Sequence, residues 1–278
     1  MCLGLDPDPA NLDPGAGGAD GGVADRAARA VAESCRTLIH GAAPACVAAK
    51  LQLACFERLG APGWAALESV GAAAREAGLL VIADGKRGDV PVSAAAYGQA
   101  LFGATPTPWG DVSGLVADAA TVNPLLGGDA LDPLVDAAAS SGAGVFCLVR
   151  TSNAGAADLF DAPSPEAPLY ERIAAMVAER SSRLVGNSGL SGAGAVVGAT
   201  QPRHLARLRE LMPQAIFLIP GVGAQGGRAA DLGPAVGSHP ASVLVTASRS
   251  IARASDPGRA AEALRDELWR LASPRDSE

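Results

Sequence analysis

One stretch sets the pattern for the whole chain: Leu79-Leu80-Val81-Ile82-Ala83, followed at once by Asp84. A continuous apolar run of this length, ended by a polar residue, is typical of a parallel strand that is buried on both faces. Seven more runs of this kind occur, at residues 2–5, 46–49, 119–122, 144–149, 195–197, 215–219 and 242–245. The sequence therefore predicts eight buried parallel strands.

Alanine-rich segments with helical spacing separate these runs, and we expect helices over residues 23–39, 64–77, 93–101, 131–140, 168–182, 202–211 and 260–272. Eightfold alternation of strand and helix is the pattern of a (β/α)8 TIM barrel. A doubly wound sheet would have fewer strands and a Gly-x-Gly-x-x-Gly turn after an early strand. The first run here leads instead into Asp6-Pro7-Asp8-Pro9. We therefore predict one α/β TIM-barrel domain over residues 1–278, with a short or missing N-terminal segment before strand one.

Composition excludes several classes of protein. With 49% hydrophobic and 18% charged residues, the chain is not disordered. Its net charge of −7, without a basic stripe, argues against nucleic-acid binding. The five cysteines form no CxxC pair and lie near no metal-spaced histidines, which favours free thiols in a reducing compartment. Because the sequence shows neither a secretory leader nor an apolar run of 18 residues, we expect a cytoplasmic protein without a membrane partner.

The densest polar cluster directly follows the quoted stretch and contains Asp84, Lys86 and Asp89. Residues i and i+2 of a strand point to the same side, so we expect Asp84 and Lys86 to project together into the barrel mouth. Charges at a buried strand end are costly unless they pair. The cluster predicts either a structural salt bridge or a charge network that holds Lys86 protonated beside a substrate.

Lys50 ends the apolar run of the preceding strand. A lone lysine at a strand end is usually solvated, with its amine extended into water. Because the two strands are neighbours, however, Lys50 can approach Asp84, and we include Lys50 in the candidate site.

A glycine-rich segment, residues 220–227, follows the seventh strand, and Ser248 and Arg249 follow the eighth. In phosphate-binding barrels the loops after these two strands, together with a short helix N-terminus, hold the phosphate. Glycines such as Gly221 and Gly223 let the backbone approach an anion, and Arg249 could grip the anion bidentately. The segment therefore predicts a phosphate site, with a purely structural turn as the alternative.

Other strand ends carry further hydrogen-bonding groups: Asp6, Asn123, Ser152 and Asn153. Asp6 could bond sugar hydroxyls, and the uncharged groups would suit the amide edge of a heterocycle. An Asp-Pro turn and helix N-caps are the ordinary alternatives. The sequence shows neither a His/Cys/Asp constellation that suggests a metal nor a Ser/His/Asp set, and we assign no catalytic role to the three histidines.

Together these motifs resemble the orotidine 5′-monophosphate (OMP) decarboxylase family. Asp84-Gly85-Lys86-Arg87-Gly88-Asp89 is similar to the family's Asp-x-Lys-x-x-Asp signature, and residues 50–60 resemble the segment with its other catalytic lysine. Further similar segments are residues 121–127, 150–153, 220–227 and 248–251. The matches run in order from Leu3 to Ile251, and the extended loops resemble the longer bacterial branch.

The resemblance implies conversion of OMP to UMP and CO2 in de novo pyrimidine biosynthesis, with no cofactor or metal. Asp84 would lie against the substrate carboxylate and Lys86 would donate a proton to C6, while Lys50 and Asp89 complete the charge network. Loss of CO2 leaves a C6 carbanion without a π-system to receive the charge, so a fixed ammonium must stabilise it.

The resemblance also implies the residues that bind the substrate. Ser152 would bond the pyrimidine amide, Asp6 the ribose, and Gln225 with Arg249 the phosphate. The family's second signature Asp reaches the partner subunit's site, so we expect a homodimer in which Asp89 and Ser93 serve the partner's site. Ser93 stands where the family usually has Thr and keeps the hydroxyl. The expected binding set is completed by Asn123, Asn153, Pro220, Gly221, Gly223 and Ser248.

Two alternatives remain open. A sister enzyme such as 3-keto-L-gulonate 6-phosphate decarboxylase shares the signature but has an acidic magnesium ligand where this chain has Lys50. A catalytically dead phosphosugar- or nucleotide-binding protein is the other alternative. A pure binder gains nothing from holding Asp84 near an anionic substrate, so the complete charge set argues against it.

Overall fold

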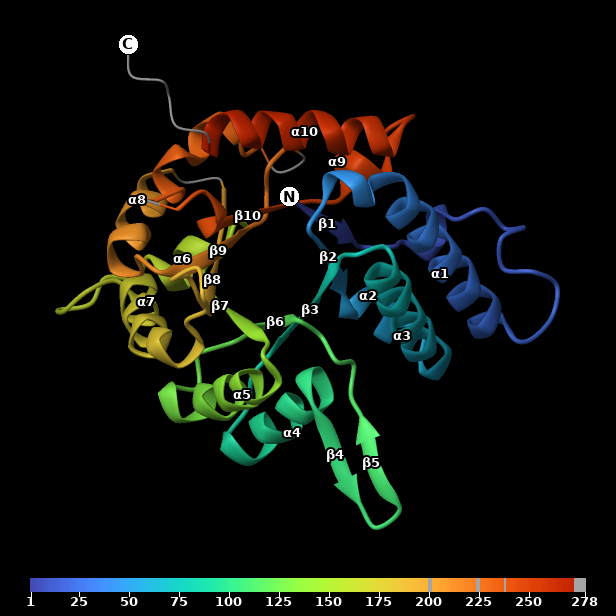
Figure 1. The fold of residues 1–278 in the computed structure, drawn as a ribbon, viewed down its shortest axis with the longest axis horizontal. Helices are drawn as coiled ribbons and strands as arrows, with labels where there is room; N and C mark the ends of the chain where they lie inside the picture. Colours follow the sequence, from blue (N-terminus) through green and yellow to red (C-terminus); the bar gives the residue numbers. More distant parts are fainter. Residues whose placement is uncertain (200–201, 224–225, 238, 273–278) are drawn as a thin grey trace. The chain divides into compact units, whose positions relative to one another are not determined.

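The computed structural model describes residues 1–199, 202–223, 226–237 and 239–272. Within these residues the parallel strands are β1 (Cys2–Leu5), β2 (Ala48–Gln52), β3 (Leu80–Arg87), β6 (Ala119–Val122), β7 (Gly144–Arg150), β8 (Ser191–Val197), β9 (Ala215–Ile219) and β10 (Val243–Ala247). They form a closed barrel in the order β1-β10-β9-β8-β7-β6-β3-β2 (Figure 1). The predicted TIM-barrel class is confirmed.

All seven predicted helices are found: the one over residues 202–211 has the predicted ends, and the other six have ends shifted by a few residues. The helices are α1 (Val23–Ala42), α2 (Leu53–Glu57), α3 (Ala61–Glu76), α4 (Pro91–Phe102), α5 (Gly128–Ser141), α6 (Ala156–Phe160), α7 (Leu169–Glu179), α8 (Pro202–Leu211), α9 (Arg249–Ala252) and α10 (Pro257–Ala272). The short helices α2, α6 and α9 were not predicted, because four or five residues carry no readable period.

The predicted ends of three strands were clearly wrong. β8 begins at Ser191, four residues before the predicted run. β2 begins two residues later than expected and continues through Lys50 to Gln52, and β3 continues through Asp84 to Arg87. The apolar runs end earlier than the strands because the last inward positions carry polar side chains that pair with one another. The candidate site therefore begins inside the strands rather than in the loops after them.

The chain divides into two compact units, residues 1–85 with 247–265 and residues 86–246 with 266–278. The single domain over residues 1–278 stays a prediction.

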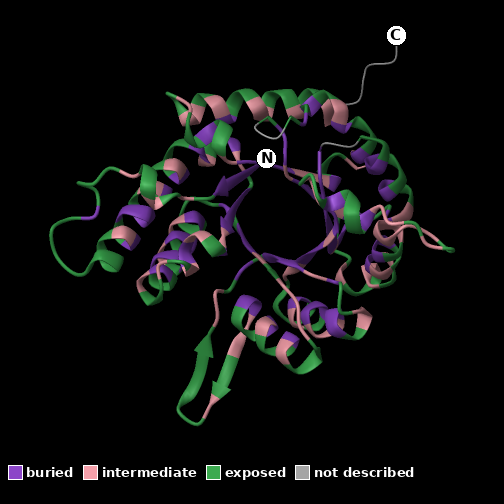
Figure 2. Ribbon diagram, turned by 180° about the vertical axis from the view of Figure 1, so that it is seen from behind, coloured by how far each residue is buried: buried purple, intermediate pink, exposed green. Residues whose placement is uncertain are grey.

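In the first unit α1 packs against α3. The buried side chains of α1 recur at helical spacing and leave the opposite side exposed (Figure 2): Ala28, Val31, Ala32, Cys35 and Ile39.

In the second unit α4 packs against α5, and a hairpin of two antiparallel strands, β4 (Ala104–Thr107) and β5 (Gly110–Ser113), extends beyond α4 (Figure 1). The sequence analysis missed this hairpin. Its strands have four residues each, and Pro106 interrupts the first, so no alternating pattern is visible. Trp109 in the turn is 91% exposed.

A buried arginine ties α8 to β9 in the same unit. The Arg209 guanidinium donates to the carbonyls of Met212, Ala215, Ala235 and Ser242 and lies 3.8 Å from the Phe217 ring centroid. Burial lowers the pKa of Arg209 to about 10. The side chain satisfies carbonyls that would otherwise be buried without donors.

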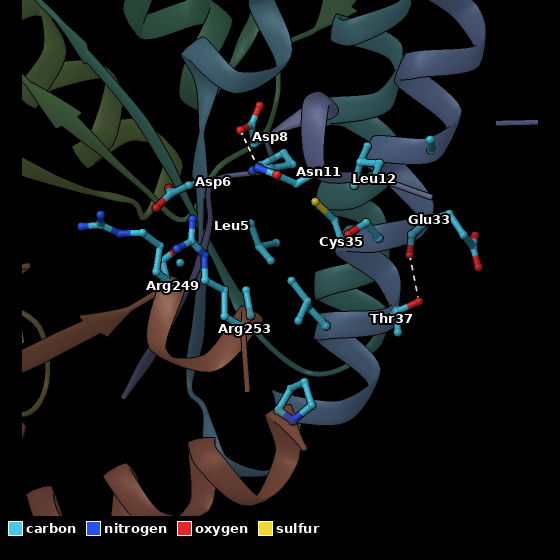
Figure 3. A pocket seen from close by; sticks show the side chains of 18 of the residues that line it. Leu5, Asp6, Asp8, Asn11, Leu12, Glu33, Cys35, Thr37, Arg249 and Arg253 are labelled. Atoms are coloured by element: carbon cyan, nitrogen blue, oxygen red, sulfur yellow. Dashed lines mark hydrogen bonds between the residues drawn. The ribbon is translucent and has the colours of Figure 1, made fainter. Parts of the chain in front are cut away.

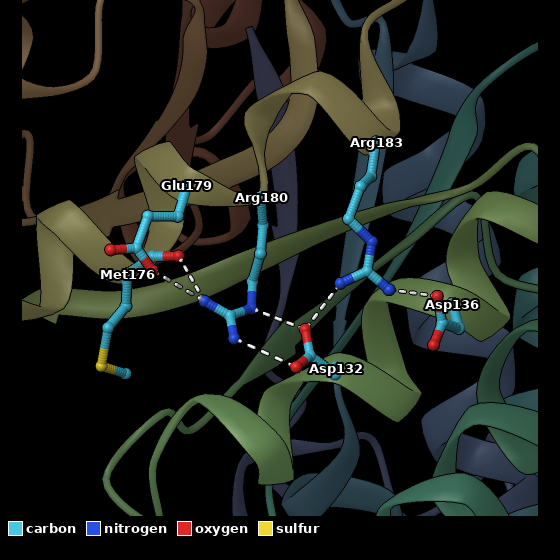
Figure 4. A network of polar contacts seen from close by, with 6 residues as sticks. All are labelled: Asp132, Asp136, Met176, Glu179, Arg180 and Arg183. Atoms are coloured by element: carbon cyan, nitrogen blue, oxygen red, sulfur yellow. Dashed lines mark hydrogen bonds and ion pairs between the residues drawn. The ribbon is translucent and has the colours of Figure 1, made fainter.

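An exposed ion-pair network connects α5 to the end of α7 (Figure 4). Arg180 contacts Asp132 through Nε and Nη2 at 2.9 and 3.2 Å, and Arg183 contacts both Asp132 and Asp136. Burial raises the pKa of Asp132, but hydrogen bonds from the two arginines lower it below its ordinary value. Because these carboxylates are solvent-accessible, we assign the network a modest structural role and no chemistry.

Candidate active site

A buried ion pair lies on β2 and β3. Lys50 Nζ lies 2.5 Å from Asp84 Oδ2, and the two side chains are only 8% and 6% exposed. In the strand register Lys50 is opposite Ile82, and Gln52 is opposite Asp84. The amine therefore reaches one pleat forward along the neighbouring strand to meet the carboxylate.

Two further side chains join this pair. Gln52 Nε2 donates to the same Asp84 Oδ2 at 3.1 Å, and Lys50 Nζ lies 3.6 Å from Asp6 Oδ1. The sequence analysis did not single out Gln52, because an amide at a strand end carries no signal of its own. Gln52 and Lys50 together hold one oxygen of Asp84 and so fix the rotation of the carboxylate.

The surroundings of Lys50 keep its amine charged. Burial by itself lowers the pKa of Lys50, but the Asp84 and Asp6 carboxylates raise it above its ordinary value. A lysine with a raised pKa holds its proton more tightly. Lys50 is therefore suited to be a fixed positive charge rather than a proton donor.

Lys86 differs from Lys50 in exposure and in backbone conformation. The residue is exposed, and its φ of +48° lies in the left-handed region that side chains other than glycine seldom adopt. Its N–H donates to Thr121 Oγ1 at 3.0 Å. The alternation rule for extended strands does not describe this residue, since the backbone is not extended there.

The segment after Lys86 is fixed to the end of β6. Asn123 N donates to the Arg87 carbonyl at 2.7 Å, and Asn123 Oδ1 accepts from Leu125 N at 3.0 Å. A Cβ at Gly88 would lie 2.4 Å from the Asn123 carbonyl oxygen. The packing of this segment on Asn123 therefore leaves room only for glycine at position 88.

Gly88→Ala is accordingly expected to destabilise the protein by about 1–3 kcal/mol, the usual cost of overpacking. The matched control is Gly71→Ala in α3, where the new Cβ would meet only ordinary contacts at 3.7 and 3.9 Å. Alanine there should be neutral or stabilising, because it favours helix. Urea unfolding of the three proteins measures both effects, and equal stability of Gly88→Ala and wild type would contradict the close packing.

Asp89 and Ser93 surround the start of α4. Asp89 is half-buried, and its Oδ1 accepts from Val90 N at 2.7 Å. Ser93 is half-buried in the first turn of α4. Both residues therefore follow Lys86 closely in the sequence and belong to the second unit.

Ser152 and Asn153 follow β7, whose last residue is the buried Arg150. Arg150 pairs with Asp161 through two contacts of 2.7 and 3.0 Å, and this hydrogen bonding lowers the pKa of Asp161. Ser152 is half-buried and packs closely on Gly198, where a Cβ would lie 2.7 Å from the Ser152 Cα. Asn153 is exposed and accepts from the Thr151 hydroxyl at 2.7 Å.

The glycine-rich loop after β9 forms a tight turn. Gly221 and Gly223 have φ of +101° and +76°, which only glycine adopts readily. Gly223 N donates to the Gly227 carbonyl and Gly227 N donates to the Gly221 carbonyl, at 2.9 and 3.0 Å. Both N–H groups are therefore engaged within the loop. Pro220 is half-buried at its start, and the predicted site residue Gln225 lies outside the described residues.

Ser248 and Arg249 line a cavity of about 540 Å³ within the first unit, and Figure 3 shows Arg249 together with other lining residues. Ser248 precedes the first residue of α9, and Arg249 is exposed. Asp6 also lines this cavity, whereas Lys50 and Asp84 do not. The cavity is of ligand size, with carboxylates and guanidinium groups on its wall: Asp6, Asp8, Glu33, Arg249 and Arg253.

Neither a metal-binding cluster nor a membrane-spanning helix is found among the residues that the structure describes. In the described ranges no group of three or more His, Cys, Asp or Glu side chains is placed to hold a metal ion. None of the described helices is long and apolar enough to cross a membrane.

A family model, "Orotidine 5′-phosphate decarboxylase / HUMPS family", matches residues 1–264. The chain belongs to this family. Orotidine 5′-phosphate decarboxylase of Deinococcus radiodurans is 44% identical over 237 residues, covering 83% of this chain and 82% of that protein. The enzyme of the same name from Rhodopirellula baltica is 39% identical over 254 residues, covering 90% and 82%.

A solved structure of Leishmania donovani OMP decarboxylase has the same fold. It aligns with a TM-score of 0.76 and 32% sequence identity, covering 98% of this chain and 93% of that chain. The resemblance to the orotidine 5′-phosphate decarboxylase family noted from the sequence motifs is thereby confirmed.

In this member of the orotidine 5′-phosphate decarboxylase family, lysine is confined to the motifs discussed. The chain contains two lysines in all, Lys50 and Lys86. The structure places Lys50 in a buried ion pair and Lys86, with an exposed side chain, near the end of β3. Gln52 and Thr121 lie in the matching segments but were not predicted as site residues, because their contacts arise from strand register.

Proposed function

We propose that this chain is a carboxy-lyase that converts OMP to UMP and CO2, a step of de novo pyrimidine biosynthesis, with Lys50, Asp84, Lys86 and Asp89 as its charged machinery. The observation that carries the proposal is the buried pair of Lys50 and Asp84 at the start of the Asp-x-Lys-x-x-Asp motif. Membership of the family and curated relatives named orotidine 5′-phosphate decarboxylase support the same reaction.

In the proposed reaction the bond between C6 and the carboxylate carbon breaks, and its electron pair stays on C6 while CO2 leaves. Asp84, held by Lys50 and Gln52, faces the departing carboxylate, and their repulsion ends when CO2 leaves. The ammonium of Lys86 stabilises the developing carbanion and then gives its proton to C6, forming UMP. Lys86 recovers a proton from water.

The remaining predicted residues are proposed to bind substrate. Ser152, Asn123 and Asn153 would bond the pyrimidine, and Asp6, 3.6 Å from Lys50 Nζ, the ribose. The phosphate would lie with Arg249, Ser248 and the loop that contains Pro220, Gly221 and Gly223; Gln225 keeps its proposed place there. Binding energy from a phosphate remote from C6 can be used to organise the reacting groups.

Lys50 separates this proposal from the sister activity within the same family. A magnesium-dependent sugar-phosphate decarboxylase needs an acidic metal ligand at the end of strand two, where this chain has a cation. The raised pKa of Lys50 keeps that cation charged. A protonated amine 2.5 Å from Asp84 occupies the carboxylate that a metal would need.

The test is to incubate the purified protein with OMP and excess EDTA and to follow the loss of the orotate absorbance together with CO2 release. We expect steady turnover in the presence of the chelator. A parallel reaction contains 3-keto-L-gulonate 6-phosphate with Mg²⁺ and should yield no CO2. Turnover of the sugar phosphate without turnover of OMP would replace the proposed function with the sister activity.

We further propose a cytoplasmic homodimer in which Asp89 and Ser93 serve the partner's site. Two apolar side chains beside them, Val90 and Val92, are 53% and 85% exposed, and Leu125 and Leu126 are also exposed. Exposed apolar side chains of this kind suit a contact with a second protein surface. The five cysteines are free thiols, which suits the reducing cytoplasm.

Shared sites predict complementation between two inactive variants, Lys86→Ala and Asp89→Asn. In a mixed dimer one site contains both changes, whereas the other contains neither. After unfolding and refolding of an equimolar mixture, half of the dimers are mixed, so about a quarter of wild-type activity should return. Refolding each variant alone is the control. No recovery from the mixture, in dimers verified by light scattering, would show that Asp89 serves its own subunit.

A further inference from the structure

We propose that Thr121 is a positioning residue for this reaction: its hydroxyl holds the backbone of Lys86 in the left-handed conformation from which the amine acts. The inference rests on the proposed role of Lys86 as proton donor. The juxtaposition that carries it is the 3.0 Å hydrogen bond from Lys86 N to Thr121 Oγ1.

The conformation of Lys86 needs support from its surroundings. Among the described residues only Lys86 and Val116 combine a side chain with a positive φ, of +48° and +51°. In this region Cβ crowds the neighbouring carbonyl, so the conformation persists only where other contacts determine it. Such strained residues concentrate at functional sites, and Lys86 is part of the family signature.

Three successive contacts hold the segment from Lys86 to Gly88 against the end of β6. Lys86 N donates to Thr121 Oγ1, Asn123 N donates to the Arg87 carbonyl, and Gly88 packs on the Asn123 backbone. Of the two hydrogen bonds, only the first uses a side-chain acceptor. It is therefore the one that a substitution can remove while the backbone bond remains.

The hydroxyl of Thr121 is well placed for this role. Thr121 is 1% exposed on β6, so its side chain is held by packing and its oxygen stays where the Lys86 N–H needs an acceptor. On the neighbouring strand β7, Phe146 is paired with Thr121 in the strand register. A side chain fixed in this way can determine the position of the exposed Lys86 near the end of β3.

Loss of the hydroxyl should affect catalysis more than binding. Without this acceptor the left-handed state loses support and the ammonium samples positions away from C6. A displacement of about 1 Å can cost about 100-fold in rate. Contacts to ribose, base and phosphate do not involve Lys86 N, so KM should change little.

The experiment compares Thr121→Val, which is nearly isosteric but lacks the hydroxyl, with Thr121→Ser, which keeps it. Thr246→Val is the matched control: Thr246 is buried on β10, and its Oγ1 has no hydrogen-bond partner among the described residues. We expect Thr121→Val to lower kcat about 10- to 100-fold with KM within about threefold. Thr121→Ser and Thr246→Val should stay within about threefold of wild type in both constants.

A second measurement makes the outcome independent of turnover. Amide hydrogen exchange of the peptide that contains Lys86 should quicken at least about tenfold in Thr121→Val and stay slow in Thr121→Ser and Thr246→Val. Unchanged exchange and kcat in a folded Thr121→Val, or a Thr121→Ser as impaired as Thr121→Val, would overturn the proposal. If wild type failed to decarboxylate OMP, the proposed function would fall, while the exchange data would still decide whether Thr121 holds this backbone.

Discussion

Replacing Lys86 with alanine is expected to lower kcat for OMP decarboxylation by at least about 10⁴-fold while the protein stays folded. The variant loses both the charge that stabilises the carbanion and the proton that quenches it. Lys86 is exposed, and its backbone bond to Thr121 does not involve its own side chain, so little packing is lost. Steady-state kinetics and a thermal melt measure the two parts of this prediction.

Lys86→Arg separates charge from proton donation. Arginine keeps the positive charge but does not give up a proton at neutral pH, and its planar fork differs in shape from an ammonium. We expect this variant to be nearly as inactive as Lys86→Ala. Activity of Lys86→Arg near that of wild type would show that Lys86 is not the proton donor.

Chemical restoration of the amine gives a stricter test. Lys86→Cys should be inactive, and alkylation of the new thiol with 2-bromoethylamine replaces bromide and creates a lysine analogue at the same position. The native thiols should react slowly, since burial raises the pKa of Cys35 and Cys147 to about 12 and that of Cys46 to about 11. Wild type treated in the same way is the control and should keep its activity.

The second large effect concerns the stability of the Lys50–Asp84 pair. Lys50→Met should lower the free energy of unfolding by about 3–5 kcal/mol, because it leaves the Asp84 carboxylate buried without its cation. Asp84→Asn should cost a similar amount by removing the anion 2.5 Å from Lys50 Nζ. Both variants should also lose decarboxylation.

The double variant Lys50→Met/Asp84→Asn distinguishes folding from chemistry. Replacing a whole buried pair with uncharged groups is often close to neutral, so the double variant should recover most of the lost stability and remain inactive. Guanidinium unfolding of the four proteins yields the coupling energy. Additive losses in the double variant would show that the two charges do not stabilise each other.

The stabilisation by the Lys50–Asp84 pair has a defined pH dependence. The pKa of Lys50 is raised on folding, so the pair's contribution is complete below the pKa of an unfolded-state lysine, about 10.4, and falls as pH rises through the folded pKa. The difference in the free energy of unfolding between wild type and the double variant should therefore become smaller as the pH rises above about 10.4. An advantage that grows with alkaline pH would contradict the raised pKa.

The sequence predicted the barrel and its strands well because each strand is a continuous apolar run between alanine-rich helices. It missed the ends of β2 and β3, where buried polar residues continue the strand, and the hairpin of β4 and β5, whose strands are too short to show a period. Lys50 and Asp84 could be paired from strand order alone. Gln52 and Thr121 could not, because their contacts depend on register and on the left-handed backbone of Lys86.

Because the two lysines differ in exposure, an amine-reactive reagent should modify one of them in preference to the other. The amine of Lys50 is buried in an ion pair with Asp84, whereas Lys86 is exposed. An acylating reagent at mildly alkaline pH should therefore label Lys86 in preference to Lys50. Because the N-terminal α-amine also reacts with acylating reagents, peptide mapping would then distinguish a tag on Lys86 from one at the N-terminus.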